Sequence, residues 1–396
     1  MIYAVNASTT KMSKTAIAAM LPFLENNFGN PSSLHSVGQT AAEAMAEARK
    51  TVAECLGVSD PKNIIFTSGG SESDNQAIIS AAKIGLKKGK KHIVSTAFEH
   101  HAVLHTLKKL EKEGFEVTYL PINDNGIVSA AQVGEAITEN TCLRTVMYAN
   151  NEIGTLQPIR EIGAVCRNKG VIFHTDAVQA VGHLPISVDE DNIDMLSLSA
   201  HKFGGPKGIG ALYVKKGILI SSLIEGGDQE RGKRAGTENV ASIVAMAAAL
   251  RESCDNMEKN NEKIKALRDK LIEGIGKIPH SILNGDRENR LPSNVNFCFE
   301  GIEGESLILL LDEKGIYASS GSACASGSLD PSHVLLALGR PHEIAHGSLR
   351  LSINEELTDA DADKIIADVF EVVSYLRGIS PIWRDMMSGK KEFVIK

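Results

Sequence analysis

The sequence has none of the features that mark disulfide-rich, zinc-binding or membrane-spanning proteins. Its six cysteines are spread over 396 residues and none belongs to a CxxC pair, so neither a disulfide framework nor a zinc site is expected. No apolar run approaches the roughly 18–20 residues that a membrane-spanning helix needs. The first residues lack a charged segment followed by an apolar one, so we expect no signal peptide. Free thiols favour a reducing compartment, and we expect the cytoplasm.

The charge balance and the composition also narrow the choice of partner. The net charge of −7 gives little attraction for nucleic acid or for an anionic membrane, and we expect neither as a partner. Hydrophobic residues make up 43% and charged residues 23%, as is typical of a globular protein. A chain of 396 residues can form roughly two domains or one large α/β body.

Short apolar runs typical of β-strands alternate with segments of helical spacing between Ile64 and Val214. The alternation predicts an α/β fold with a mainly parallel seven-stranded sheet that is covered by helices on both faces. Segment 223–240 is rich in glycine and charge, and we predict a long functional loop there. The strand-like runs lie at 64–66, 92–95, 117–120, 144–149, 171–177, 195–199 and 210–214.

The pattern changes from about Glu252 onward, where a charged helix with one apolar stripe begins. Strand-like and helical segments follow it, and they predict a second, smaller α+β domain. We therefore divide the chain into a large domain over residues 15–255 and a small domain over residues 1–14 and 256–396. The segments lie at 293–299, 305–313, 348–353 and 358–376.

Lys202 stands in "SLSAHKFGGPKGIGAL", directly after a strand of buried type and before a glycine-rich turn. A lysine in this place is commonly a solvated side chain. Here, however, Ser199, His201 and Lys202 gather at one strand end, where α/β folds place ligands. A lysine at such an edge can form a Schiff base with a carbonyl cofactor.

Asp176 in "HTDAVQA" follows an apolar strand, so its carboxylate is expected to be partly buried and to need a partner. One interpretation is a helix N-cap, and the other is the acid that pairs with the pyridinium nitrogen of pyridoxal phosphate. His100 in "FEHHAVLHT" allows a purely structural interpretation as well. Its neighbour His101 does not favour a metal, because adjacent side chains on a helix diverge.

The segment "FTSGGSESDNQA" (66–77) predicts a strand, a small polar turn and a helix. Backbone N–H groups of Gly69, Gly70 and Ser71 at the helix start can bind an anion such as a phosphate. The same segment can be a plain turn with Ser71 as the N-cap and Asp74 three residues later. The two interpretations are compatible, because both use the free N–H groups of the first helical turn.

Cys324 lies in "SSGSACASGS" (319–328), a segment composed like a flexible linker. A structural cysteine normally lies among apolar neighbours, and Cys324 has no bulky one in this segment. The plain alternative is a surface cysteine in a loop.

Nine motifs occur along the chain in an order that resembles the cysteine desulfurases of the nitrogen-fixation and iron–sulfur-cluster assembly type. These belong to the class-V aminotransferases, within the fold-type I pyridoxal phosphate enzymes. The resemblance runs from "FGNPSSLH" (28–35) to "LRGISPIW" (376–383), close to the whole chain. The motifs are "TSGGSESDN", "EHHAVLHT", "ANNEIGTLQP", "HTDAVQAVG", "SLSAHKFGGPKGIGALY", "QERGKRAGTENV", "EGES", "SSGSACAS" and "HGSLRLS".

The resemblance implies that the cofactor is pyridoxal 5′-phosphate and that Lys202 carries it as a Schiff base. It also implies that Asp176 holds the pyridinium nitrogen, that Gln179 bonds the phenolic oxygen of the ring and that His100 stacks on the ring face. The residues implied to hold the phosphate are Gly70, Ser71, Ser199, His201 and Thr237 of the partner subunit.

The resemblance further implies that Asn151, beside the cofactor, and Arg350 bind the carboxylate of the substrate. Catalysis is assigned to Cys324 as the nucleophile, with Lys202 and His100. The implied reaction removes sulfur from L-cysteine, gives L-alanine and leaves on Cys324 a persulfide that passes to an acceptor for iron–sulfur cluster assembly. The implied partners are a second copy of the chain, in a homodimer, and a sulfur-acceptor or iron–sulfur scaffold protein. No resident metal is implied, and only Cys324 is considered as a transient iron–sulfur ligand.

Other activities remain open at this point. Selenocysteine lysis, or another pyridoxal phosphate reaction on the same fold, would use the same groups. Plain transamination needs no nucleophilic thiol, so Cys324 disfavours it. A non-catalytic assembly platform would be expected to lack Lys202 or Cys324, and both are present.

Three places depart from the family pattern. Val5 in "VNASTT" stands where an acid is usual, and Asp228 stands where a third glycine is common. Ser352, Ile353 and Asn354 replace the usual serine-leucine-glycine turn after Arg350. None of these differences removes a catalytic group.

Overall fold

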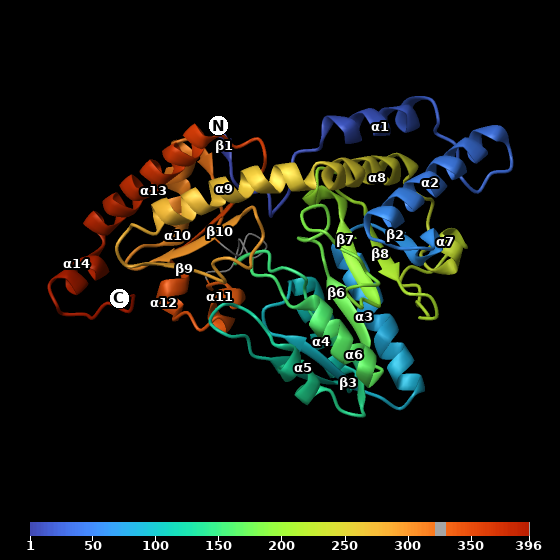
Figure 1. Cartoon of the computed structure of the whole chain (residues 1–396), viewed down its shortest axis with the longest axis horizontal. Helices are drawn as coiled ribbons and strands as arrows, with labels where there is room; N and C mark the ends of the chain where they lie inside the picture. Colours follow the sequence, from blue (N-terminus) through green and yellow to red (C-terminus); the bar gives the residue numbers. More distant parts are fainter. Residues whose placement is uncertain (321–329, 396) are drawn as a thin grey trace.

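The computed structural model describes residues 1–320 and 330–395, which form a larger α/β body and a smaller α+β body (Figure 1). Helix α8 (Val240–Asp255) lies in the larger body, and α9 (Met257–Ile275) follows it into the smaller one. No described helix combines the length and the apolar character that crossing a membrane requires.

The larger body contains a seven-stranded sheet, in the order β2-β8-β7-β6-β5-β3-β4. Strand β8 is antiparallel to both of its neighbours and the other pairings are parallel, which confirms the predicted mainly parallel sheet. The strands are β2 (Ile64–Thr67), β3 (His92–Thr96), β4 (Glu116–Leu120), β5 (Thr141–Thr145), β6 (Ile172–Asp176), β7 (Met195–Ser199) and β8 (Gly210–Val214).

One predicted strand is displaced. The apolar run 144–149 suggested a strand there, but β5 begins at Thr141 and ends at Thr145. Beyond that end, the N–H groups of Val146 and Tyr148 still donate to carbonyls at His174 and Asp176. The segment therefore follows β6 while leaving the regular sheet, which explains why its apolar pattern continues past the strand.

Helices cover both faces of the sheet, so alternate residues of each strand enter different cores. Ile64 and Phe66 of β2 pack into one core, and Ile65 between them packs into the other. The first face carries α1 (Lys14–Glu25), α2 (Ser36–Cys55), α5 (Ala130–Ala136), α6 (Ile159–Lys169) and α8, and the second face carries α3 (Gly70–Lys87) and α4 (His101–Lys112).

The smaller body is built on an antiparallel sheet in the order β12-β10-β9, formed by β9 (Ser281–Leu283), β10 (Asn294–Phe299) and β12 (Ser348–Ser352). Helices α9, α10 (Gly304–Glu313) and α13 (Asp359–Ile379) share its core. Strand β1 (Ile2–Tyr3) pairs with β11 (Ile316–Tyr317), so the N-terminal residues belong to this core too. The proposed division of the chain near residues 14 and 255 stays a prediction, and these cores are in keeping with it.

The remaining elements are short and connect or flank the two bodies. They are the 3₁₀ turns η1 (Pro61–Asn63) and η2 (Ala200–Lys202) and the helices α7 (Gln229–Gly232), α11 (His333–Ala337), α12 (His342–Ala345) and α14 (Pro381–Met387).

Candidate active site

A cavity of about 610 Å³ opens at the edge where the parallel strands of the large sheet end. His100 follows β3, Asp176 is the last residue of β6, and Lys202 lies in η2 directly after β7. Because β3, β6 and β7 run in the same direction, these three residues meet at one edge of the sheet. All three line the cavity.

The structure brings most of the predicted site residues together around this cavity. Thr237 is exposed and is not among the described residues that line it. Cys324 lies outside the described residues. The predicted residues that line the cavity are Gly70, Ser71, His100, Asn151, Asp176, Gln179, Ser199, His201, Lys202 and Arg350.

Lys202 is held by the N-terminal segment of the chain. Its Nζ donates hydrogen bonds to the carbonyl oxygens of Ala7 at 2.7 Å and Ser8 at 2.8 Å. The Gln179 side chain donates to the same Ala7 oxygen at 2.9 Å, and Thr10 donates to the His201 carbonyl. The segment that follows Tyr3 therefore crosses the cavity and fixes the lysine.

Two buried carboxyl groups lie close together at the end of β6. Asp176 is 5% exposed and Asp74, on α3, is 1% exposed, and both have ligand atoms within 4.8 Å of each other and of His100. Burial raises the pKa of Asp74 well above its usual value, and the charge of Asp176 raises it further. Burial also raises the pKa of Asp176, whereas His100 and Lys202 lower it. A like-charged pair in such surroundings favours retention of a proton, and the stronger upward shift of the pKa is at Asp74.

His174, the histidine beside Asp74 Oδ1, supplies no compensating positive charge. The His174 Nε2 atom lies 3.6 Å from Asp74 Oδ1, but burial lowers the pKa of His174 to about 3, so the ring is neutral. Among the described residues, no group donates a hydrogen bond to that oxygen. Asp176, in contrast, accepts a bond at 3.0 Å from the backbone N–H of Val178. The described residues that follow Asp176 form a turn and begin no helix, so the N-cap interpretation of Asp176 is wrong.

The turn after β2 and the first turn of α3 form a cradle of backbone N–H groups. The N-cap is Gly69 rather than Ser71, and its φ of 151° favours glycine, so the predicted N-cap is corrected by two positions. A Cβ at Gly70 would lie 2.6 Å from the Val178 side chain, so only glycine fits. The free N–H groups of the first turn face the cavity, beside Ser199.

His201 completes the cradle as a neutral side chain. Burial, followed by the charges of Lys202 and Lys207, lowers its pKa to about 4. Its Nδ1 lies 3.1 Å from the Thr9 hydroxyl, which fixes the ring. The imidazole can therefore bond an anion without carrying a charge of its own.

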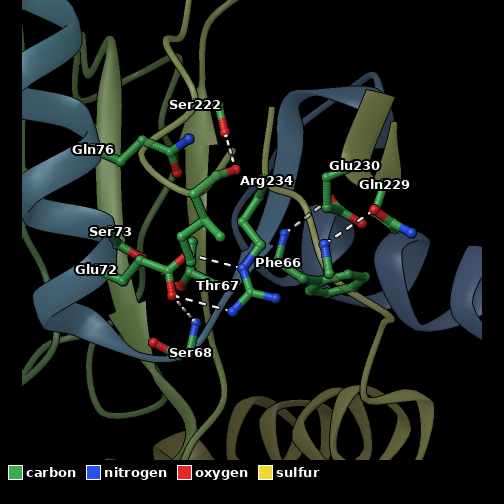
Figure 2. A network of polar contacts seen from close by, with 12 residues as sticks. Phe66, Thr67, Ser68, Glu72, Ser73, Gln76, Ser222, Gln229, Glu230 and Arg234 are labelled. Atoms are coloured by element: carbon green, nitrogen blue, oxygen red, sulfur yellow. Dashed lines mark hydrogen bonds and ion pairs between the residues drawn. The ribbon is translucent and has the colours of Figure 1, made fainter. Parts of the chain in front are cut away.

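A network of polar contacts fastens the loop 223–240 to this cradle (Figure 2). Glu72 accepts a bond from the Ser68 backbone at 2.7 Å and pairs with Arg234 at 3.0 Å. Glu230 accepts from the Phe66 backbone at 3.0 Å. The predicted long loop is therefore held to the strand and helix that carry the cradle.

The same loop contains a strained turn that a buried ion pair stabilises. Glu230 and Arg231 have φ values of 48° and 60°, which are unfavourable for residues with a side chain. Two guanidinium nitrogens of Arg49 bond the two carboxylate oxygens of Glu230, at 2.6 and 2.7 Å. This bidentate geometry explains how the turn holds its conformation.

The opposite side of the cavity comes from the smaller body. Arg350 on β12 is 2% exposed, and it donates to the carbonyl oxygen of Asn151 at 2.9 Å and to the Ser8 hydroxyl at 2.8 Å. Its backbone also exchanges hydrogen bonds with Ser319. A guanidinium fixed in this way presents a planar donor surface suited to a carboxylate.

Among the cavity-lining residues to which sequence reasoning gave no role in the site, three are polar side chains of particular interest. Asp74 was considered only as a capping partner, although it belongs to the motif "TSGGSESDN". Glu152, in "ANNEIGTLQP", is buried and accepts a bond from the Ser332 hydroxyl. Burial raises the pKa of Glu152, whereas Ser332 and Arg350 lower it. His333, whose Nε2 lies 2.9 Å from the Glu99 carbonyl, had no sequence signal, because it belongs to none of the nine motifs.

The whole chain matches known proteins closely. The family model described as aminotransferase class-V matches residues 2–365. A protein of Clostridium botulinum named cysteine desulfurase IscS is 53% identical over 394 residues, covering 99% of each chain. The cysteine desulfurase NifS of Azotobacter vinelandii is 45% identical over 383 residues, covering 96% of this chain and 95% of its own. The chain belongs to the cysteine desulfurases of the class-V aminotransferase family.

Solved structures agree with this membership. A NifS-like protein superimposes on the desulfurase fold with a TM-score of 0.89 at 36% identity, covering 95% of this chain and 100% of its own. A structure described as SspA in complex with cysteine gives a TM-score of 0.80 at 38% identity, covering 89% and 99%. These likenesses confirm the predicted fold class.

Two of the three departures from the desulfurase pattern lie against each other. Val5 forms a β-bridge with Ser352, and the Ala7 N–H donates to the Ser352 hydroxyl at 2.8 Å. The Asn6 side chain donates to the Ser352 carbonyl at 2.9 Å. The substituted segments therefore support each other and still place Ala7 beside Lys202. The third departure, Asp228, lies at an exposed position directly before α7.

Proposed function

We propose that the enzyme removes sulfur from L-cysteine, releases L-alanine and leaves a persulfide on Cys324, with pyridoxal 5′-phosphate as its resident cofactor. One observation carries the proposal. A lysine amine, a buried carboxylate and a helix N-terminus converge on one cavity, in a chain of the cysteine desulfurase family. These are the groups that an aldehyde, a pyridinium nitrogen and a phosphate require.

The donor set fits this cofactor. The first turn of α3, with Ser199 and His201, would hold the phosphate, completed by Thr237 of the partner subunit. Asp176 would hold the ring nitrogen, and His100, which lines the same cavity, would lie on the ring face. When bound, pyridoxal phosphate supplies an electron sink for loss of the Cα proton of an amino acid.

The side chains that face the substrate perform two tasks. Arg350 and Asn151 would bind the substrate carboxylate and fix which Cα bond faces the cofactor site. The Lys202 amine would move the Cα proton, because it lies at the edge where Cα must sit. Its two bonds to the carbonyls of Ala7 and Ser8 hold the amine in place until then.

Cys324 would act as the nucleophile, as the resemblance implies. Its thiolate attacks the substrate sulfur, so that an S–S bond forms, the substrate C–S bond breaks and Cβ takes up a proton. The products are alanine and the Cys324 persulfide, and the atoms balance without a further oxidant or reductant. The persulfide sulfur would then pass to the thiol of an acceptor.

Within the same proposal, the enzyme works as a homodimer in the cytoplasm and delivers sulfur for iron–sulfur cluster assembly. The exposed position of Thr237, outside the cavity of its own chain, supports a shared site.

Purified protein supplied with cofactor should be yellow and should form alanine and sulfide from L-cysteine in the presence of a reductant. When an iron–sulfur scaffold protein is added, either the rate of sulfide release should increase or sulfur should be transferred to the scaffold in place of being released as sulfide. Selenocysteine, tested in parallel, should react more slowly than cysteine. A colourless protein that forms no alanine would contradict the proposal.

A further inference from the structure

Two cysteines far from the cavity lie at the ends of neighbouring helices. Cys55 is the last residue of α2, and Cys254 lies in the last turn of α8. Both are half-buried and pack against the same core, and their thiols share a hydrogen bond. The other described cysteines, Cys142, Cys166 and Cys298, are buried separately.

The surrounding contacts fix this pair independently of the thiols. Helices α2 and α8 lie side by side (Figure 1). Glu54, next to Cys55, forms an ion pair of 2.5 Å with Arg251 of α8. Arg251 precedes Cys254 by three residues, so both project from the same face of α8 toward the end of α2. The two sulfurs are therefore held at one contact between packed helices.

We propose that Cys55 and Cys254 form a reversible redox site, in which a peroxide converts the two thiols into a disulfide that links α2 to α8. The site does not depend on the proposed desulfurase chemistry. A disulfide that forms and is then reduced again is the kind expected where a compartment keeps thiols reduced.

The local electrostatics divide the roles between the two sulfurs. The hydrogen bond from Cys55, aided by the positive charge of Arg251, lowers the pKa of the Cys254 thiol. The same hydrogen bond, together with burial, raises the pKa of Cys55. These contacts favour deprotonation of Cys254 over that of Cys55, so we assign Cys254 as the attacking thiol and Cys55 as the resolving thiol.

The oxidation proceeds in two balanced steps. The Cys254 thiolate attacks one peroxide oxygen, which breaks the O–O bond and yields a sulfenic acid and hydroxide. Cys55 sulfur then attacks the Cys254 sulfur, so that the S–S bond forms, the S–O bond breaks and water leaves. The two sulfurs together lose two electrons, which reduce the peroxide, and a dithiol reductant reverses the reaction.

The test is peroxide titration of the full-length enzyme carrying Cys324→Ser, which removes a competing thiol. After hydrogen peroxide treatment, remaining thiols are alkylated and the peptides are mapped by mass spectrometry without reduction. We expect loss of two alkylated thiols per chain, a peptide pair joined through Cys55 and Cys254, and full recovery with dithiothreitol. The oxidised protein should also unfold at a higher temperature, because the cross-link closes a long loop.

Two variants test the division of roles. Cys55→Ser should leave Cys254 to accumulate sulfenic and sulfinic acid, whereas Cys254→Ser should leave Cys55 alkylated and slow to oxidise. Cys166→Ser, at a buried cysteine away from the pair, is the matched control and should still form the disulfide. The proposal would be overturned if Cys55 and Cys254 were still as fully alkylated as Cys166 after peroxide treatment. A disulfide that joins either of them to a different cysteine would also overturn it.

Discussion

The proposed cofactor side and the proposed substrate side of the cavity are built in different ways. On the cofactor side, Gly70, Asp176 and Lys202 follow or end strands of one sheet, so the sheet alone brings them together. On the substrate side, Arg350 meets Ser8 across 342 positions of sequence, and it meets Asn151 through a contact between the two bodies. The cofactor side is a product of local motifs, and the substrate side depends on how the bodies pack.

This difference predicts different responses to substitution. A change on the cofactor side should remove one chemical function and leave the fold intact. A change on the substrate side should alter both the binding of substrate and the contact between the two bodies, because the same guanidinium serves both.

The largest effect is expected for Lys202→Ala. Loss of the amine should remove the colour of the bound cofactor and lower alanine formation by about 10³-fold, because this amine is the group placed to move the proton. Lys216→Ala, which removes an exposed lysine that does not line the cavity, is the control and should stay yellow and active. Normal turnover by Lys202→Ala would remove this lysine from the reaction.

Arg350→Lys should have the next largest effect. It keeps the positive charge but loses the planar pair of donors, so kcat/KM for L-cysteine should fall about 10²-fold, mainly through KM. Arg340→Lys, which alters a guanidinium bonded to Asn284 outside the cavity, is the matched control. Thermal unfolding of both variants separates lost binding from lost packing. An unchanged kcat/KM for Arg350→Lys would show that the substrate carboxylate lies elsewhere.

Arg234→Ala should weaken cofactor binding by about three- to tenfold. Arg234 neutralises Glu72, whose carboxylate otherwise repels a phosphate in the cradle. Glu72→Gln combined with Arg234→Ala should restore most of the affinity, because the repelling charge is gone. Cofactor titration followed by absorbance measures both variants. A double variant as weak as the single one would contradict this role of the ion pair.

Asp74→Asn should have the smallest effect, visible in the stability of cofactor-free protein. Because the pKa of Asp74 is raised on folding, its contribution to the free energy of unfolding is full below about pH 4, the unfolded value, and declines as pH rises through the folded pKa. The groups that face it are Asp176, Glu99, His100 and His174.

The amide that Asp74→Asn introduces needs no proton to remain neutral. The unfolding temperature of the variant should therefore rise relative to that of the parent as pH increases, and the difference should reach about 1–2 °C near pH 8. Asp194→Asn, at a carboxylate paired with Lys215, is the control and should show no such gain. A pH-independent difference between Asp74→Asn and the parent would mean that Asp74 does not hold a proton.

The sequence predicted well which residues of the large sheet meet at one edge, because its signals there are local. Apolar runs marked the strands, and polar residues at their ends marked the edge where they meet. The failures were also local and had physical causes. The run 144–149 keeps hydrogen bonds to β6 after the strand ends. Gly69 is the N-cap of α3 because a glycine adopts a positive φ without steric strain.

The substrate side and the buried acid could not be derived from pattern alone. Arg350 was identified through the resemblance, since nothing in its own strand indicates that it reaches Ser8. Asp74 was identified only as a capping residue, because its meeting with Asp176 depends on the packing of α3 against β6. The contact between Cys55 and Cys254 likewise depends on two helices that are distant in sequence.

The most direct test of the account is the intact mass of the enzyme after a single addition of L-cysteine without reductant. The account predicts that each chain gains one sulfur atom, that the gain maps to the peptide containing Cys324, and that one alanine is released per sulfur bound. The gain should be absent in both Lys202→Ala and Cys324→Ser. Added sulfur that persists in Lys202→Ala, or that maps to another cysteine, would contradict the assignment of this cavity as the desulfurase site.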